Sequence, residues 1–269
     1  MTALVRRIYL TVTAINPRLR VSAALSTSGG APSPDSAWYA STPYAYHLQD
    51  WRSWLQEGVL DLGLPMTYKR EYDPVEKTQF DGWIAWEKDH QYGRGVAVGT
   101  ALYLNAVSDG MAQWQRVRQP SALGRHALGM TGYSYTTPSN VVISRRDFVN
   151  AAVAELFTQA ASTPVLPWKD TATLGHLMGR LSQPVPCRNL DRYPLSLSGP
   201  VSRSLLTDGS GWFGTVDLPL GEYLLSVDVA IPAVTLQLPV AVTAGAVTEQ
   251  NVRLPFCASH KVYFPQVSK

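Results

Sequence analysis

Residues 49–68, QDWRSWLQEGVLDLGLPMTY, decide how this chain folds. Trp51, Trp54 and Leu55 recur at the spacing of one helix face, and Gly58 stands where a left-handed residue ends a helix. The run that follows this glycine is too apolar and too short for another helix, so it predicts a buried strand. The polar and aromatic end of such a strand is where α/β proteins place their sites.

The flanking sequence repeats this alternation of helix and strand. Strands are predicted at residues 19–26, 61–68, 95–105 and 128–135. Helices are predicted at residues 4–15, 108–118 and 145–157, and after the N-caps Asp50 and Asp73. The helix at 4–15 shows an apolar stripe made of Leu4, Val5, Ile8, Val12 and Ile15. Four successive strand–helix units favour a parallel sheet with helical crossovers, and they amount to half of an eightfold barrel.

A longer pattern in this region resembles a known family. It consists of QDW at 49–51, WL at 54–55, Gly58, Asp61, and Pro65-Met66 followed by Tyr68. This pattern is similar to the signature that the glycosyl hydrolase-like 10 family carries between the fifth helix and the sixth strand of its barrel. The resemblance implies an α/β fold in which residues 1–165 form the C-terminal half of a (β/α)8 TIM barrel, strands five to eight. The family's acid on strand four, the most plausible catalytic group, would then lie in the missing first half.

Beyond residue 165 helices give way to period-two alternation and turn clusters. The segments TDGSGWF at 207–213 and DLPLGEY at 217–223 resemble the pattern of the carboxypeptidase regulatory-like domain. This resemblance implies a linker at 166–178, a small all-β prealbumin-like sandwich at 179–256 and a tail at 257–269. Such sandwiches are usually spacers or attachment modules, so the second domain indicates fold and not chemistry.

Glycosidases need two carboxyl groups that face each other across the scissile bond, one protonated and one ionised. Glu71 follows the strand that ends at Tyr68 and is a candidate general acid, although a solvated loop acid is the safer interpretation. Asp50 occupies a signature position, but its place at a helix start makes N-capping a sufficient explanation. The catalytic residues therefore stay open, with Glu71 and Asp50 as the weak candidates.

Aromatic and amide side chains at the strand ends are better placed than any acid. Sugars present apolar C–H faces and hydroxyl edges, which suit aromatic platforms with polar tips and amide partners. The predicted substrate-binding residues are Met66, Tyr68, Lys69, Tyr103, Asn105, Tyr133 and Tyr135. The loop aromatics expected to line the same cleft are Trp38, Tyr39, Tyr44 and Tyr46. Each of these positions has core or loop packing as its alternative explanation.

Composition excludes several other classes of protein. A net charge of +3 on 269 residues, with no basic cluster interleaved with aromatics, argues against nucleic-acid binding. No apolar run is long enough for a membrane span, and the first residues do not read as a signal peptide. No histidine pair has metal-ligand spacing and no glycine motif fits a dinucleotide, so neither metal nor cofactor is expected. Cys187 and Cys257 are either a disulfide or two free thiols.

The family resemblance therefore implies a glycoside hydrolase that acts on the O-glycosyl bonds of a polysaccharide, with bacterial cell-wall glycan as the leading substrate. It also implies an extracytoplasmic location. The alternative is a non-catalytic carbohydrate-binding or structural cell-surface protein. If the chain is an N-terminally truncated half-barrel, we expect it to be inactive alone and to need the missing half as a partner.

Overall fold

The computed structural model describes residues 1–184, 190–229, 234–255 and 257. The chain divides into two compact units, one made of Met1–Val5 and Arg20–Leu166 and the other of Arg6–Leu19 and Pro167–Lys269. Each unit is described by itself.

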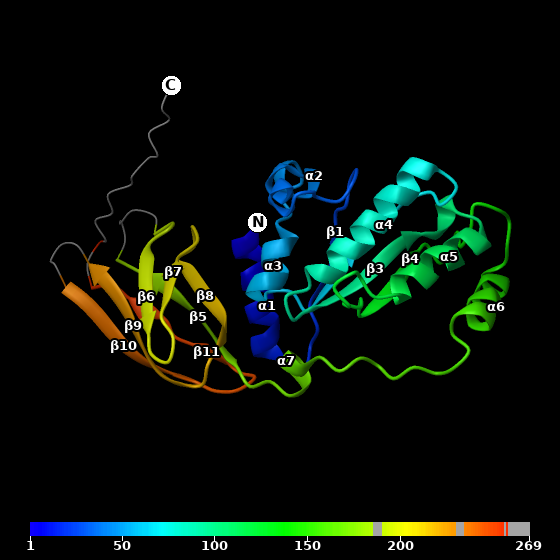
Figure 1. Cartoon of the computed structure of the whole chain (residues 1–269). Coiled ribbons are helices and arrows are strands. Elements are labelled where there is room, and N and C mark those ends of the chain that lie inside the picture. The colour runs from blue at the N-terminus through cyan, green and yellow to red at the C-terminus, as the bar shows by residue number, and fades with distance from the viewer. Residues whose placement is uncertain (185–189, 230–233, 256, 258–269) are drawn as a thin grey trace, which may run out of the picture. The chain divides into compact units, whose positions relative to one another are not determined.

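The first unit is built on a four-stranded sheet in which every strand pair is parallel, in the order β1-β2-β3-β4 (Figure 1). Its strands are β1 (Ser22–Leu25), β2 (Leu62–Pro65), β3 (Gly95–Ala101) and β4 (Gly129–Tyr133). Its helices are η1 (Asp35–Ala40), α2 (Thr42–Ala45), α3 (Trp51–Glu57), α4 (Pro74–Asp89), η2 (Leu102–Leu104), α5 (Val107–Arg118) and α6 (Arg145–Glu155). The predicted parallel sheet with helical crossovers is confirmed.

Local signals in the sequence explain where these helices begin and end. The Asp50 carboxylate accepts from the Ser53 N–H at the start of α3, and Gly58 ends that helix with φ of 89°. The Asp73 carboxylate accepts from the N–H groups of Val75 and Glu76 at the start of α4. β3 ends earlier than predicted because η2 follows it directly.

The helices α3 and α5 pack on the same face of the parallel sheet. A side chain at Gly63 would approach Leu55 of α3, and one at Gly132 would collide with Trp114 of α5. Since side chains alternate along a strand, Leu64 and Thr131 point to the opposite face, where Leu64 is half-buried and Thr131 is exposed. The ends of β2, β3 and β4 meet at one edge, which carries the candidate site.

The second unit contains two four-stranded sheets. One has the order β10-β9-β6-β7 and is antiparallel throughout, and the other joins β11, β5 and β12 in parallel with β8 antiparallel to β5. The strands are β5 (Gly175–Ser182), β6 (Pro194–Ser198), β7 (Arg203–Leu206), β8 (Trp212–Leu218), β9 (Gly221–Val229), β10 (Val234–Val242), β11 (Val247–Glu249) and β12 (Val252–Arg253). A short helix, α7 (Pro167–Asp170), precedes them. Inward side chains of both sheets, such as Leu177, Phe213 and Leu225, belong to one hydrophobic core.

Helix α1 (Thr2–Ile15) buries a different face from the predicted stripe. Leu4, Ile8 and Ile15 are exposed, whereas Tyr9 and Leu10 are buried. Most of α1 belongs to the second unit, where Leu10 packs over Gly214 of β8 and a side chain at that glycine would lie 2.5 Å from its methyl group. The stripe prediction was wrong because the partner surface, with a glycine that accepts Leu10, lies about 200 residues away in the sequence.

The predicted boundary at 165–166 falls next to Leu166, where the chain leaves the first unit, whereas the predicted boundary at 178–179 falls inside β5. Helix α1 also makes the second unit discontinuous in sequence. Within the described part of the chain, no helix is both long and apolar enough to span a bilayer. Cys257 takes part in a disulfide bond, while Cys187 lies outside the described residues.

Candidate functional site

Three tyrosines gather where β2, β3 and β4 end, and we call Tyr68, Tyr103 and Tyr133 the tyrosine cluster. The rings of Tyr68 and Tyr133 stack at 5.6 Å between centroids, and Tyr103 meets both edge-on at 6.5 and 6.0 Å. Tyr103 is 38% exposed and Tyr133 is 57% exposed. Burial, and then the neighbouring tyrosines, raise the pKa of Tyr68, so its hydroxyl stays protonated at neutral pH. The cluster is therefore an aromatic surface that is partly open to solvent.

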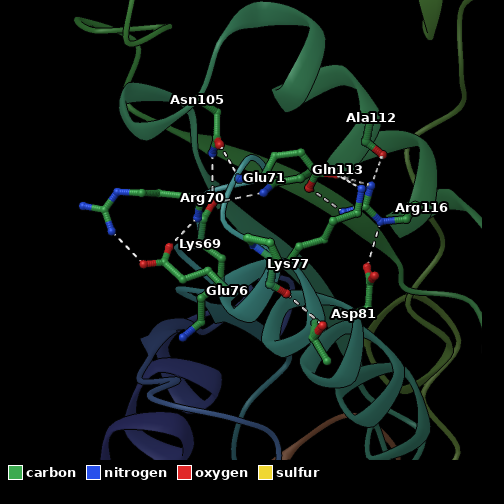
Figure 2. Close-up of polar contacts among 12 residues, drawn as sticks. Lys69, Arg70, Glu71, Glu76, Lys77, Asp81, Asn105, Ala112, Gln113 and Arg116 are labelled. Atoms are coloured by element: carbon green, nitrogen blue, oxygen red, sulfur yellow. Dashed lines mark hydrogen bonds and ion pairs between the residues drawn. The ribbon is translucent and has the colours of Figure 1, made fainter.

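Asn105 supports the loop after β2 from within. Its amide oxygen accepts from the Glu71 N–H at 2.7 Å, and its amide nitrogen donates to the carbonyls of Lys69 and Ala101, both at 2.9 Å (Figure 2). Gln113 of α5 donates to the same Lys69 carbonyl at 3.0 Å. Asn105 is 1% exposed, so its polar atoms hold the backbone and do not face a ligand. This residue positions the loop next to Tyr68.

Glu71 is an ion-paired acid that points toward α4 and α5. Both of its oxygens accept from the Arg116 guanidinium, at 2.9 and 2.6 Å, and Lys77 lies 2.9 Å away (Figure 2). Arg116 also binds Asp81 at 2.7 Å. Burial acts to raise the pKa of Glu71, but hydrogen bonds from Arg116 and Lys77 outweigh it and hold that pKa below its usual range. A carboxylate kept ionised and paired in this way is poorly suited to be a general acid.

Lys69 and Met66 are also largely withdrawn from solvent. The Lys69 ammonium donates to the Gly29 carbonyl at 3.1 Å and to the Gln79 side chain at 2.8 Å, and burial lowers its pKa. Met66 extends β2 by a bridge to Gly99 and is half-buried. Of the predicted binding residues near β2, Tyr68 alone joins the exposed cluster.

Asp50 serves the fold. Its carboxylate accepts from the Ser53 hydroxyl at 2.6 Å and from the Trp38 indole at 3.0 Å, in addition to capping α3. Each of these contacts is structural. Asp50 therefore fixes the start of α3 and the position of the buried Trp38 ring.

The remaining aromatic candidates lie away from the tyrosine cluster. Trp38 is fully buried, with Trp51 at 4.9 Å and Trp86 of α4 at 5.2 Å between ring centroids. Tyr44 meets Trp38 edge-on, so the expectation that this loop lines the cleft is not met at these positions. Tyr135 lies beyond the end of β4, where the Arg145 guanidinium of α6 sits 5.0 Å from its ring centre.

Sequence reasoning gave no role to Glu87, a fully buried acid on α4. Its Oε1 accepts from the hydroxyl of Thr67 at 2.6 Å, directly beside Tyr68, while Oε2 has no hydrogen-bond partner. Burial raises the pKa of Glu87 to about 8, against smaller lowering effects of Thr67 and Lys88. The helical pattern of residues 74–89 places this position on the inward face. An acid on that face is the signal in the sequence by which Glu87 could have been found.

Among the described residues, no group of three His, Cys, Asp or Glu side chains is arranged to hold a metal ion. No protein-family model matches this sequence, and no curated protein matches it significantly. The likenesses found are to solved structures.

Two likenesses cover about a third of the chain. A DUF3823 family protein from Bacteroides ovatus shares 16% identity over 30% of this chain and 43% of its own, with a TM-score of 0.24. The minor pilin GBS52 from Streptococcus agalactiae shares 14% identity over 35% of this chain and 49% of its own, with a TM-score of 0.25.

A further likeness extends over most of the chain. An endo-β-1,4-mannanase of glycoside hydrolase family 26 from Cellulomonas fimi shares 12% identity over 84% of this chain and 53% of its own, with a TM-score of 0.33. This chain therefore spans about half the length of these three proteins or less.

Proposed function

We propose that this chain binds a glycan at the tyrosine cluster and belongs to a glycoside hydrolase that acts on a polysaccharide, with bacterial cell-wall glycan as the leading substrate. One observation carries the proposal: three partly exposed tyrosines close three successive parallel strands and touch one another. Aromatic rings with hydroxyl tips suit the C–H faces and hydroxyl edges of a sugar ring.

The surroundings of the cluster favour binding without rearrangement. Asn105 and Gln113 hold the loop after Tyr68 through its backbone, and the Glu71–Arg116 pair ties the same loop to α5. A rigid support reduces the entropy lost when a ligand is bound. The cluster is thus a preorganised surface.

We assign hydrolysis to residues other than Glu71 and Asp50, because the Glu71 carboxylate is paired with Arg116 and the Asp50 carboxylate caps α3. By the family resemblance, we propose that these four strand–helix units form half of a TIM barrel and act with four further units that supply the catalytic acid. The exposed Thr131 face of the sheet would then become the barrel interior. In this proposal the second unit is a carboxypeptidase regulatory-like sandwich, and the protein works outside the cytoplasm.

The test is a calorimetric titration of the chain with soluble peptidoglycan glycan strands and with mannooligosaccharides. Tyr133→Ala is expected to raise Kd about fivefold to tenfold, which corresponds to roughly 1–1.5 kcal/mol for one lost aromatic contact. Tyr39→Ala is the matched control, because Tyr39 is similarly exposed at 61% but packs on Tyr44 away from the cluster. Glycan binding that is equal in all three proteins, or absent from the wild type, would contradict the proposal.

The competing function is a non-catalytic carbohydrate-binding or surface protein. The absence of a free carboxyl group at Glu71 and Asp50 favours it over hydrolysis by this chain alone. Release of reducing ends from bound glycan distinguishes the two. Binding at the tyrosine cluster without any cleavage, even with the other half of the barrel added, would establish the binding function and refute the hydrolase.

A further inference from the structure

Ser26 and His47 form a hydrogen-bonded pair at the end of β1. The Ser26 hydroxyl lies 2.6 Å from Nδ1 of His47, although the two residues are 21 positions apart in sequence. Ser26 is 8% exposed, whereas His47 is exposed. A serine hydroxyl within hydrogen-bond reach of a histidine is the arrangement that activates a serine nucleophile.

The backbone of Ser26 is fixed by neighbours of His47. The Gln49 side chain accepts from the Ser26 N–H at 2.7 Å, and the buried Trp51 indole donates to the Ser26 carbonyl at 3.1 Å. Leu48, between His47 and Gln49, has a left-handed φ of 55°. A non-glycine residue adopts this conformation only where its surroundings enforce it, and such positions concentrate at functional sites. Here the left-handed residue is flanked by two side chains that both reach Ser26.

We propose that Ser26 and His47 are a nucleophilic dyad that cleaves an O-acyl ester. In the first step the Ser26 hydroxyl oxygen bonds to the ester carbonyl carbon while its proton moves to Nδ1 of His47. The bond from that carbon to the alcohol oxygen then breaks, and the alcohol leaves with the proton from His47. Water, deprotonated by His47, attacks the acyl-serine, and the carboxylic acid departs as Ser26 regains its proton.

Gln49 and Trp51 hold the backbone of Ser26 in place for this reaction. The Gln49 amide oxygen accepts from the Ser26 N–H, and the Trp51 indole donates to the Ser26 carbonyl. A nucleophile that is fixed in this way loses little freedom when it attacks the substrate.

The substrate class follows from the position of the dyad. Ser26 directly follows β1, and the hydroxyl of its neighbour Thr27 donates to the Met66 carbonyl at 2.7 Å, two residues before Tyr68. The dyad and the tyrosine cluster therefore lie at the same edge of the sheet. We therefore expect the substrate to be an ester between an acyl group, such as acetyl, and a hydroxyl oxygen of the glycan that the cluster binds. This choice of substrate rests on the proposed function, whereas the dyad itself does not.

The first experiment measures the dyad without any glycan. A fluorophosphonate probe is expected to label Ser26 of the full chain, located by peptide mass spectrometry, and 4-nitrophenyl acetate is expected to be hydrolysed. Ser26→Ala and His47→Ala should each reduce the hydrolysis rate at least about 100-fold, and added imidazole should restore part of the rate to His47→Ala but not to Ser26→Ala.

The matched controls are Ser28→Ala and His126→Ala, since both residues are exposed and lie outside the dyad. Neither should change labelling or rate by more than about twofold. A wild-type chain that leaves Ser26 unlabelled, or that loses no activity in His47→Ala, would overturn the dyad. Because His47 is exposed, its replacement is tolerated by the fold, and the result does not depend on whether Ser26→Ala folds.

The second experiment measures acetate release from acetylated oligosaccharides. Tyr133→Ala should raise KM for these sugars about fivefold to tenfold and leave the hydrolysis of 4-nitrophenyl acetate unchanged. If Ser26 is labelled but Tyr133→Ala and wild type have equal KM values, the esterase proposal stands and the proposal that the glycan at the tyrosine cluster is its substrate is refuted. Absence of labelling together with glycan binding at the cluster would refute the dyad and retain the proposed function.

Discussion

Replacing Glu87 by glutamine is expected to remove a pH-dependent loss of stability from the first unit. The folded protein holds the Glu87 proton up to about pH 8, whereas an unfolded chain releases it near 4.5. Between these values the folded state binds more protons, so the free energy of unfolding falls as pH rises. The window is about 3.5 pH units wide, and at about 1.4 kcal/mol per unit the wild type loses about 5 kcal/mol across it. Glutamine keeps the acceptor for Thr67 but does not titrate.

The assay is urea unfolding at pH values from 5 to 8, with tryptophan fluorescence as the signal of unfolding. Six of the eight tryptophans lie in the segment Arg20–Leu166, so the signal reports mainly the first unit. The readout is the slope of the unfolding free energy against pH, which should be flatter in Glu87→Gln than in wild type. Glu155→Gln on α6 is the control, because that glutamate is exposed and its replacement should leave the slope unchanged. Parallel pH dependence in wild type and Glu87→Gln would show that Glu87 is ionised in the fold and would refute the reasoning.

Three further substitutions test the remaining contacts. Arg116→Met should lower the free energy of unfolding by about 2 kcal/mol because it removes two hydrogen bonds to the buried Glu71 carboxylate. The loss should be smaller when Glu71→Gln is added, as urea unfolding of both variants will show. Asn105→Ala should lower the free energy of unfolding by about 2–4 kcal/mol and lower the melting temperature, because three buried hydrogen bonds are lost. An unchanged melting temperature together with weaker glycan binding would contradict the positioning role of Asn105. Asp208→Ala should destabilise the second unit above pH 4, because Ser210 and Trp212 lose a carboxylate acceptor. Burial acts to raise the pKa of Asp208, but hydrogen bonds from Ser210 outweigh it and hold that pKa below 3.8. Its contribution is therefore present above 3.8 and decreases on acidification, so calorimetry should find a smaller difference between the variant and wild type at about pH 3 than at about pH 5.

Features that depend on neighbours in sequence could be predicted. The caps Asp50 and Asp73 and the terminator Gly58 act over a few residues, and the structure has each in its expected role. The alternation of strands and helices then determined the parallel sheet, because crossovers between parallel strands need intervening helices. The meeting of Tyr68 and Tyr133 follows from the same rule, since the strands that carry them run in one direction.

Features that depend on distant partners could not be predicted. Whether Asn105 faces a ligand or the backbone is decided by the Lys69 and Ala101 carbonyls, which the strand pattern does not place. The pairing of Ser26 with His47 needs the left-handed turn at Leu48, and leucine is not a residue that signals such a turn. Asn105 was identified from the sequence as a polar side chain near a strand end, but its partners determined its role, and Ser26 and His47 were not singled out at all.

The discontinuous second unit has a consequence for the order in which the chain acquires its structure during synthesis. Helix α1 leaves the ribosome well before the turn that pairs with it, where Asp208 binds Arg7, because the two residues are 201 positions apart. At roughly 5–20 residues per second, the helix waits about 10–40 s for its partner. The first unit is completed within that interval while Leu10 remains without the glycine surface on which it finally packs. A ribosome-bound intermediate therefore exposes the Leu10 face of α1, which is the kind of apolar segment that chaperones bind.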